Sequence, residues 1–508
     1  MTRFLMAAQV AKSFSVGTAP GAPATARRTP PSHGRMRAAL GRLAHRDVPA
    51  VPTVPELDAP QVVPAARTLR REVVGSGERV PTLSGRRMPY VNLDNAATTP
   101  AMHVAIAAIS EALPHYGSVH RGAGYNARRS TDAFEESRAA IARFVGADPE
   151  RDTVVFTKNT TEAVNTLAGS MPVADGDVVL TTILEHHSND LPWRTRVPTR
   201  HIGAGCDGRL DLDDLDRRLA EFAGRVALLV VSGASNVTGV VPPIHEIARR
   251  VHAAGGRVLV DAAQLAPHRP IDMRPHDDPE HLDFVALSAH KLYAPFGSGA
   301  IVGDRRAFGA APGHPGGGTV DAVTLDEIVW TGLPHREEAG TPNLAGAVAF
   351  AAAATRLGEL GWDSLVEHER RLHERLLAGL ARIPAVRVYG PKDPATTIGV
   401  VPFTVGGMPH GLVAAILGFE HGIGVRSGCF CAQPYVAHLL GIDRAGSRAQ
   451  VAQIRAGRFA DRPGFVRASL GLHNDESDVD RLLEALDAIV AGDVAGTYRV
   501  DGHGDYRP

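Results

Sequence analysis

Cysteine is scarce in this chain. Its 508 residues contain three cysteines, Cys206, Cys429 and Cys431. Three are too few to build a disulfide framework for a chain of this size, so a reducing compartment is indicated and we expect a cytoplasmic protein. A zinc site with four protein ligands needs more partners at close spacing than one Cys-x-Cys pair supplies, so no metal is expected.

An excess of one charge and long apolar runs are also lacking. The chain has 54 basic and 55 acidic residues, for a formal net charge of −1. Proteins that bind nucleic acid usually carry a basic domain or stripe, so no nucleic acid is expected as a partner. No segment approaches the roughly 20 consecutive apolar residues of a membrane span, so no membrane is expected either.

The first 85 residues differ in composition from the rest. They are rich in Ala, Pro and Arg, and no acidic residue precedes Asp47. Residues 17–34 have too little apolar surface to bury, and we expect residues 1–85 to form a disordered N-terminal extension. An Arg-rich, acid-poor N-terminus is also typical of an organelle transit peptide, and a start codon placed too early would leave the same pattern. Both alternatives stay open.

Beyond residue 85, short apolar runs alternate with amphipathic stretches. Helices are predicted over residues 130–146, with Ser130 or Thr131 as the N-cap, and over 243–256. Buried strands are predicted at 152–157, 177–183, 225–233, 257–264 and 283–291. The alternation predicts an α/β domain with a mostly parallel sheet, in which ligands bind at the carboxyl ends of the strands.

The length of the chain predicts more than one domain. We expect a large domain over residues 86–345, whose first segment also packs on a smaller α+β domain over residues 346–495. The polar, Gly- and Arg-rich stretch 441–464 is expected to be a surface insertion in the smaller domain. Residues 496–508 would form a tail.

A lysine and an aspartate stand at the ends of two predicted strands. Lys291 ends the strand 283–291, where partial desolvation would lower the pKa of its amine and make it a nucleophile for a carbonyl. Asp261 closes the preceding apolar run, where a buried carboxylate is costly unless it is paired. An aspartate for a ring nitrogen and a lysine for an aldehyde are the pair that pyridoxal phosphate requires. A solvated strand-end lysine and a helix-capping aspartate are the alternatives.

Hydroxyl groups near these strands suit a phosphate. Thr160 and Thr161 precede a predicted helix, and helix N-termini bind anions, although an ordinary N-cap explains the threonines equally well. Ser288 and His290, beside Lys291, could donate hydrogen bonds to the same phosphate.

Three further residues are candidates for binding. His186 follows the strand 177–183, and its neutral ring could stack on the cofactor and relay protons. Asn236 follows the strand 225–233 and could reach the ring hydroxyl of the cofactor, or could simply form a turn. Arg467 lies on an apolar strand, where its guanidinium could clamp a substrate carboxylate.

Taken in order, these stretches resemble the class V aminotransferase family of pyridoxal-phosphate enzymes, and within it the Suf-type cysteine desulfurases, also called selenocysteine lyases. The resemblance covers nearly everything from about residue 88 to 492 and rests on YVNLDNAATTP, SVHRGAGYN, NTTEAVN, EHHSN, SNVTG, DAAQ, SAHKLYAPFGSGA, HREEAGTPN, RSGCFCAQP and VRASLGLHN. It implies fold type I, with a mostly parallel seven-stranded sheet in the large domain, a smaller α+β C-terminal domain, and a homodimer.

The resemblance also implies roles for individual residues. Lys291 would bind the cofactor aldehyde covalently, Asp261 would pair with the ring nitrogen, and His186 would stack on the ring. Asn236 would bind the substrate carboxylate rather than the ring. The other implied roles are a contact to the ring oxygen for Gln264, phosphate binding for Thr160, Thr161, Ser288, His290 and, from a second subunit, Thr341, carboxylate binding for Arg467, and a place at the pocket mouth for Arg426.

The catalytic cysteine of this family precedes the motif A-Q-P, five residues after an arginine, and Cys431 holds that position. The resemblance therefore implies a cysteine desulfurase that moves sulfur from L-cysteine to Cys431 as a persulfide, releases alanine and passes the sulfur to an acceptor protein.

One departure bears on the substrate. Desulfurases of this branch usually carry two histidines immediately before the cysteine, where this chain has Cys429 and Phe430. Another class V activity on a different amino compound (an aminotransferase, epimerase or lyase) stays open, as does a catalytically silent partner of sulfur carriers. Cys429 would be a spare sulfur acceptor or simply a small buried side chain.

Overall fold

The computed structural model describes residues 65–458, 462–502 and 504–508. Residues 1–64, which make up most of the expected N-terminal extension, lie outside this range, so the prediction for them stays untested. Within the described part, no helix combines the length and the apolar character needed to cross a membrane.

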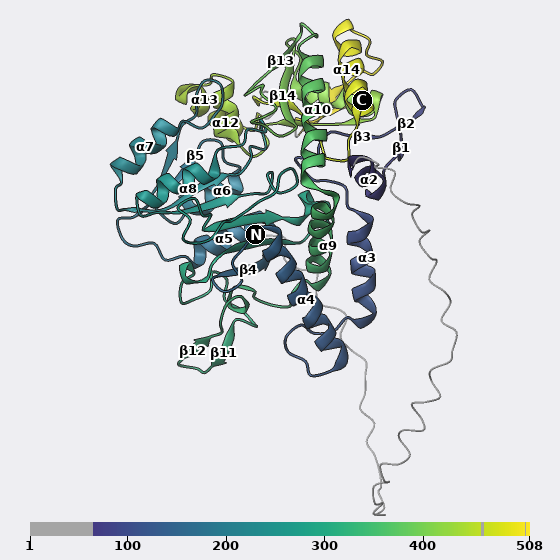
Figure 1. Cartoon of the computed structure of the whole chain (residues 1–508). Helices are drawn as coiled ribbons and strands as arrows, with labels where there is room; N and C mark the ends of the chain where they lie inside the picture. The colour runs from purple at the N-terminus through teal and green to yellow at the C-terminus, as the bar shows by residue number, and fades with distance from the viewer. Residues whose placement is uncertain (1–64, 459–461, 503) are drawn as a thin grey trace, which may run out of the picture. The chain divides into compact units, whose positions relative to one another are not determined.

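The largest sheet has seven strands in the order β4-β10-β9-β8-β7-β5-β6. Figure 1 labels two of them, β4 and β5. Its strands are β4 (Asp152–Thr157), β5 (Val178–Thr182), β6 (Thr199–Ile202), β7 (Val226–Ser232), β8 (Arg257–Asp261), β9 (Phe284–Ser288) and β10 (Gly299–Asp304). Neighbours from β9 to β6 are parallel, whereas β10 is antiparallel to both β9 and β4. The predicted α/β fold with a mostly parallel seven-stranded sheet is confirmed.

Both faces of this sheet are buried, because helices cover each of them. Successive side chains along each strand point alternately to the two faces. One face packs against α3 (His103–Ala112), α4 (Tyr125–Phe144), α7 (Leu212–Glu221), α8 (Ile244–Ala253) and α9 (Leu344–Leu360). The other face packs against α5 (Thr160–Ser170) and α6 (His187–Arg194). On β4, for example, Val154 joins the first core and Val155 the second. Strand β4 is therefore buried on both sides although it is an edge strand.

A second, antiparallel sheet has the order β13-β14-β17-β16. Its strands are β13 (Val386–Val388), β14 (Val400–Val405), β17 (Phe465–Ser469) and β16 (Arg426–Gly428), and its core includes α10 (Trp362–Leu380), α11 (His410–His421) and α14 (Glu476–Ala491). Strand β3 (Val91–Asn92) pairs with β15 (Ile423–Gly424), and Val91 packs in this same core.

The domain boundary at residue 345 stays a prediction. Helix α9 begins at Leu344, and its buried side chains pack in the core of the seven-stranded sheet. In the expected insertion, α13 (Arg444–Arg455) has no buried residue. In the expected tail, β18 (Arg499–Val500) and β19 (Tyr506–Arg507) pair as a short hairpin.

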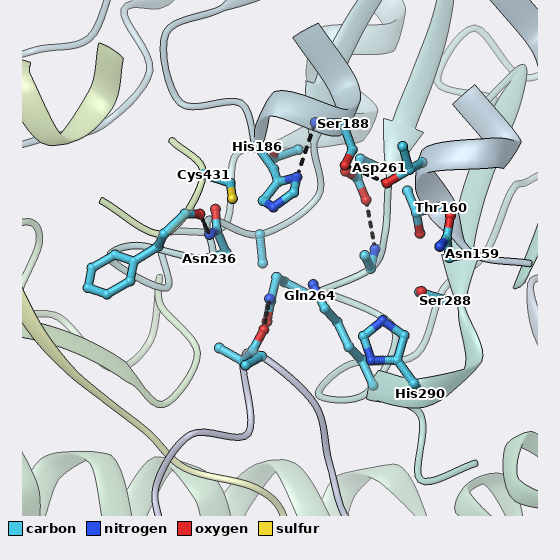
Figure 2. A pocket seen from close by; sticks show the side chains of 18 of the residues that line it. Asn159, Thr160, His186, Ser188, Asn236, Asp261, Gln264, Ser288, His290 and Cys431 are labelled. Carbon is cyan, nitrogen blue, oxygen red and sulfur yellow. Dashed lines mark hydrogen bonds between the residues drawn. The ribbon is translucent and has the colours of Figure 1, made fainter. Parts of the chain in front are cut away.

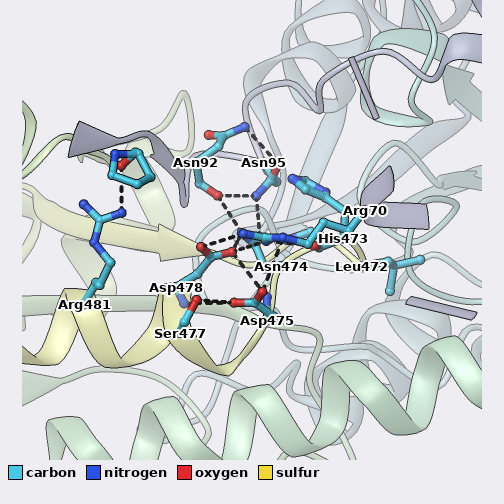
Figure 3. Close-up of polar contacts among 12 residues, drawn as sticks. Arg70, Asn92, Asn95, Leu472, His473, Asn474, Asp475, Ser477, Asp478 and Arg481 are labelled. Carbon is cyan, nitrogen blue, oxygen red and sulfur yellow. Dashed lines mark hydrogen bonds and ion pairs between the residues drawn. The ribbon is translucent and has the colours of Figure 1, made fainter. Parts of the chain in front are cut away.

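Residues 65–85 correct the expectation of disorder up to residue 85. Helix α2 (Ala65–Glu72) is folded, and β1 (Arg79–Pro81) pairs with β2 (Arg87–Pro89). Leu69 of α2 is fully buried in the large core. Arg70 donates a hydrogen bond of 2.6 Å to the carboxylate of Asp478 on α14 (Figure 3). Glu72 of α2 also pairs with Arg356, and Ala66 is buried beside Leu69. Buried apolar contacts and ion pairs thus hold a helix that composition alone assigned to the extension.

Helix α4 corrects a second expectation, because it begins at Tyr125 rather than near residue 130. The hydroxyl of Ser130 donates to the carbonyl of His115 and accepts from the backbone N–H of Gly117. The hydroxyl of Thr131 accepts from the N–H of His120. Both side chains therefore bind the loop before the helix instead of capping the helix itself.

The anchoring of α2 predicts a loss of stability when Leu69 is replaced by alanine. Removing a fully buried leucine side chain should lower the free energy of unfolding by about 2–5 kcal/mol. Urea denaturation followed by circular dichroism measures the change. Arg67→Ala, an exposed position on the same helix, is the matched control and should shift the free energy by less than about 0.5 kcal/mol. Equal midpoints for the two variants would show that α2 adds nothing to the folded state.

Candidate active site

A cavity of about 290 Å³ lies at the carboxyl ends of the parallel strands (Figure 2). Residues at or just after the carboxyl ends of β5, β7, β8 and β9 line one side of the cavity. Arg426 on β16 and Arg467 on β17 of the second sheet line the other side. The structure brings together twelve of the predicted residues: Thr160, Thr161, His186, Asn236, Asp261, Gln264, Ser288, His290, Lys291, Arg426, Cys431 and Arg467.

Thr341 is the predicted site residue that this pocket does not include. It is exposed and lines a separate cavity of about 210 Å³. The expected contact of Thr341 with the phosphate involves a second subunit, so it stays a prediction.

Asp261 is the last residue of β8. Lys291 is not the last residue of β9, as the sequence predicted, but ends the short 3-10 turn Ala289–Lys291 that follows it; the two side chains influence each other electrostatically. Desolvation lowers the pKa of Lys291 from 10.5 to about 8, although the nearby Asp261 carboxylate acts in the opposite direction. Burial raises the pKa of Asp261, against the hydrogen bond of 3.0 Å that it accepts from the N–H of Ala263 and against the charge of Lys291. A substantial part of the lysine is therefore neutral amine near pH 8.

One end of the pocket is built to receive an anion. Helix α5 begins at Thr160 and points its first backbone N–H groups toward the pocket, with Asn159 as the N-cap that accepts from the N–H of Glu162. The Thr160 hydroxyl and Nδ1 of His290 are buried and find no hydrogen-bond partner among the described residues. Burial also lowers the pKa of His290 to about 4, so its ring is neutral. Thr161 hydrogen-bonds to Ser188 at 2.6 Å.

His186 presents a neutral ring to the middle of the pocket. Burial, and then the charge of Lys291, lowers the pKa of His186 to about 3. Its Nδ1 accepts a hydrogen bond of 3.1 Å from the N–H of Ser188, so the ring proton is on Nε2. A ring in this state is suited to stacking, and it is a weak base for the proton relay that the sequence also suggested.

Cys431 is exposed at the other end of the pocket, on a tight turn (Figure 2). Phe430 and Cys431 have φ angles of 54° and 55°, and the N–H of Ala432 closes the turn on the carbonyl of Cys429 at 2.9 Å. Left-handed conformations cost side-chain-bearing residues about 1–2 kcal/mol each. They persist only where the surroundings enforce them.

Two groups from the large sheet enforce this turn. The Asn236 side chain donates to the carbonyl of Phe430 at 2.7 Å, and the N–H of His187 donates to the carbonyl of Cys431 at 2.7 Å. The position of the Cys431 thiol is thus set by the same loops that carry Asn236 and His186. Cys429 is partly buried, and burial raises the pKa of its thiol.

Two arginines converge on Asp94 beside the turn. Arg467 is 2% exposed and donates to Asp94 at 3.0 Å and to the carbonyl of Asn236 at 2.8 Å, while Arg426 pairs with the other oxygen of Asp94 at 2.8 Å. Burial lowers the pKa of Arg467 to about 10, so it stays charged at neutral pH. Its Nε–H has no partner within the described part of the chain. This geometry leaves a buried cation with an unused donor at the pocket wall.

The sequence did not single out several residues of this site. Asp94 holds Arg426 and Arg467 in place through ion pairs. Its position two residues after β3, in the first motif, was the available signal. Glu185 is buried and accepts from Thr182, Asn189 and Ser232 at 2.6–2.7 Å. Burial raises the pKa of Glu185 to about 7. It ties the ends of β5 and β7 together beneath His186, a role that no sequence spacing reveals.

Pyridoxal phosphate fits the polar groups that the protein itself leaves unpaired. The Thr160 hydroxyl and the His290 nitrogen, both without partners among the described residues, lie at the anion end. The Gln264 amide donates to the carbonyl of Ala96, whereas its side-chain oxygen has no partner in the described part of the chain. Asp261 offers a carboxylate to a protonated ring nitrogen, and Lys291 an amine to an aldehyde. Each unpaired group thus matches one polar part of the cofactor.

The fold and the site together define a class: an α/β enzyme with a reactive lysine, a buried aspartate and an anion-binding helix end at the carboxyl edge of a parallel sheet. A family model described as Aminotransferase class-V matches residues 91–482. The chain belongs to the class V aminotransferase family.

Relatives and solved structures agree with this assignment. A probable cysteine desulfurase from Synechocystis sp. is 36% identical over 417 residues, covering 79% of this chain and 91% of that protein. A cysteine desulfurase from Dickeya dadantii is 35% identical over 412 residues, covering 79% and 92%. The apo structure of a cysteine desulfurase from Thermococcus onnurineus has a TM-score of 0.71 at 32% identity, covering 84% and 98%, and the cysteine desulfurase CsdA from Escherichia coli has 0.67 at 29%, covering 80% and 96%.

The lowered pKa of Lys291 predicts its reactivity in the ligand-free protein. Reductive methylation by formaldehyde requires neutral amine, so its rate at Lys291 should rise with a midpoint near pH 8 rather than near 10.5. In Asp261→Asn the midpoint should fall further, because the carboxylate that favours the ammonium form is gone. Mass spectrometry of the Lys291 peptide measures the rate, with exposed Lys158 as the internal reference. A wild-type midpoint near 10.5 would contradict the description of the pocket.

Proposed function

We propose that this chain is a pyridoxal-phosphate-dependent cysteine desulfurase that takes sulfur from L-cysteine onto Cys431 and releases alanine. The observation that carries the proposal is the convergence of Lys291, Asp261 and Cys431 on one pocket. The first two are what the cofactor needs, and an exposed thiol at the rim is what removal of sulfur adds to it. The named relatives and solved structures support the same activity.

In this proposal, residues already at hand hold the cofactor. Asp261 pairs with the ring nitrogen, Gln264 contacts the ring oxygen and His186 stacks on the ring. Thr160, Thr161, Ser288 and His290 bind the phosphate at the start of α5, and Lys291 binds the aldehyde. When bound, pyridoxal phosphate supplies an aldehyde for the substrate amine and an electron-accepting ring next to the substrate Cα.

The substrate carboxylate is assigned to the arginine side of the pocket. Arg467 is buried and charged and has an unused Nε–H, and Asn236 lies next to it. Asp94 holds the guanidinium in place through a second nitrogen. The carboxylate would therefore meet an oriented, poorly hydrated cation, which favours charge-assisted hydrogen bonds.

Lys291 is the group that moves protons at the substrate Cα. With a pKa of about 8 in the ligand-free pocket, it holds neutral amine at a pH where an ordinary lysine is almost wholly protonated. The neutral amine of Lys291 would accept the Cα proton of the bound substrate. His186 stays neutral beside it, so it does not compete for that proton.

Cys431 is the nucleophile toward sulfur. Its thiolate attacks the substrate Sγ, a bond forms between the two sulfurs and the substrate Cβ–Sγ bond breaks. The electron pair of that bond stays with the alanine skeleton, which takes up a proton at Cβ, regains a proton at Cα from Lys291 and leaves as alanine. The persulfide on Cys431 is exposed at the rim, where an acceptor protein can reach it. Cys431 also lies within electrostatic reach of Arg467, a buried cation that attracts a thiolate.

The proposal includes a homodimer. Thr341 does not reach the pocket of its own chain, and the family resemblance implies that it completes the phosphate site of a second copy. The exposed hairpin of β11 (Val320–Val323) and β12 (Ile328–Trp330) carries Leu325 and Ile328 on its surface, as a segment covered by another copy would.

The activity is tested by incubating the protein with L-cysteine and a reductant and measuring sulfide and alanine. Cys431→Ser should lower both products at least about 100-fold, because the nucleophile is lost, and Lys291→Ala should do the same through loss of the proton acceptor. Cys429→Ser is the matched control two residues away and should stay within about twofold, because the turn points Cys431, not Cys429, into the pocket.

Two outcomes would contradict the proposal. Sulfur transfer at the wild-type rate in Cys431→Ser would remove the assigned nucleophile. A change in cofactor absorption with another amino acid, together with no alanine from cysteine, would point to the aminotransferase, epimerase or lyase alternatives.

A further inference from the structure

A second cluster of chemically capable side chains lies at the other end of β4 from the pocket. Asp152 is the first residue of β4, whereas Asn159 and Thr160, just past its last residue, line the pocket. His276 and His281 come from the long connection between β8 and β9. One ligand atom from each of Asp152, His276 and His281 lies within 4.8 Å of the others.

The three side chains are buried and already closely packed. The Asp152 and His276 side chains are 2% and 5% exposed, and His281 is 3% exposed. His276 Nε2 and Asp152 Oδ1 are 2.9 Å apart, and the two imidazole rings lie 4.0 Å apart at an angle of 35°. Such burial of two histidines and a carboxylate needs compensating partners.

His281 lacks one of those partners. Its Nδ1–H donates to the carbonyl of Arg274 at 2.7 Å, which fixes the tautomer and leaves a lone pair on Nε2. This Nε2 is buried and has no hydrogen-bond partner among residues that the structure describes. This lone pair lies near the Asp152 carboxylate, which is itself an acceptor, and near the Nε2–H of His276, which already donates to that carboxylate. A cation would satisfy it.

The contacts around the cluster are those that orient metal ligands. A metal-bound histidine usually donates its other ring N–H to a carbonyl or carboxylate, as His281 does to Arg274, and ligating carboxylates are themselves hydrogen-bonded. The second oxygen of Asp152 accepts from the N–H of Asp148 at 2.8 Å. The carboxylates of Asp148 and Asp304 lie within electrostatic reach of His276. Asp304 is paired with Arg306, and Arg305 donates to the backbone carbonyl of Asp152, so the Asp152 carboxylate itself has no guanidinium partner among the described residues.

We propose that Asp152, His276 and His281 bind a divalent transition-metal ion of the zinc type. The ion takes the place of the proton between Asp152 and His276 and uses the idle lone pair of His281, while the ring proton of His276 moves to Nδ1. Two imidazoles and one carboxylate suit zinc, with water as a fourth ligand. Because the site joins the β8–β9 connection to the edge strand β4 and lies away from the catalytic pocket, its role is structural.

A second histidine-rich cluster in the described part of the chain differs from this one and supplies a control. His120, Glu135 and His335 also place ligand atoms within 4.8 Å of one another. There, however, the guanidinium of Arg138 binds both oxygens of Glu135 and both of Glu338. A cation therefore already occupies the position beside these carboxylates.

The test measures Zn²⁺ and Co²⁺ binding to the full-length holoenzyme. Wild-type protein should retain one Zn²⁺ per chain through desalting, by elemental analysis, and should melt at a higher temperature with Zn²⁺ than with a chelator. His281→Gln and the isosteric Asp152→Asn should each weaken binding at least about 10–100-fold, because each removes one of three ligands. His335→Gln should leave binding unchanged. Circular dichroism verifies that each variant is folded.

The absorption of bound Co²⁺ tests the site without any substitution. Nitrogen and oxygen ligation should give ligand-field bands and no thiolate charge-transfer band. A thiolate band would place the ion at a cysteine and overturn the proposal. Wild-type protein that keeps no metal, or variants that bind as tightly as wild type, would overturn it as well.

Discussion

Desolvation of a lysine beside an aspartate is the constraint on which the pocket depends. Asp261 ends β8, and Lys291 follows the adjacent parallel strand β9 on a short turn, so the sheet and this turn together set their approach. Their attraction does not offset the hydration that the amine loses, since the pKa of Lys291 falls from 10.5 to about 8, a change of about 3 kcal/mol. An aldehyde that binds the amine and a protonated ring that pairs with the carboxylate would relieve both groups at once. The ligand-free pocket is thus a set of polar groups that suit a cofactor better than they suit one another.

The second sheet contributes the arginine side of the pocket and fixes the position of the Cys431 thiol. Its strands bring Arg426 and Arg467 to Asp94, and the turn after β16 holds Phe430 and Cys431 in left-handed conformations. Contacts from Asn236 and His187 to the carbonyls of this turn connect it to the large sheet. The Cys431 thiol is therefore fixed relative to Lys291 by hydrogen bonds that reach across the two sheets. The histidines usual in this branch are not needed for that, because the hydrogen bonds are accepted by the carbonyls of Phe430 and Cys431 and not by the side chains at positions 429 and 430.

The sheet and most of the pocket were predictable from the sequence, because buried parallel strands appear as apolar runs and each run ends in a polar residue at the same edge. Lys291, Asp261 and His186 belong to this pattern. Asp94 and Glu185 were missed because their roles are contacts with other segments of the chain. The cluster of Asp152, His276 and His281 was missed for the same reason, since His276 lies 124 residues after Asp152 along the chain. Helix α2 was missed because its buried apolar residues and the ion pairs of Arg70 and Glu72 with distant segments outweigh the composition around them. The start of α4 was misplaced because Ser130 and Thr131 bind a loop that local sequence does not show.

The most direct test of the account is the fate of the substrate sulfur in a single turnover. The holoenzyme is mixed with a limiting amount of isotopically labelled L-cysteine, alkylated and digested, and the peptide containing Cys429 and Cys431 is sequenced by fragmentation mass spectrometry. The account predicts one labelled sulfur added to Cys431, with an equal amount of alanine in solution. Label on Cys429, or alanine formed with no label on the peptide, would contradict the assignment of Cys431 as the sulfur acceptor.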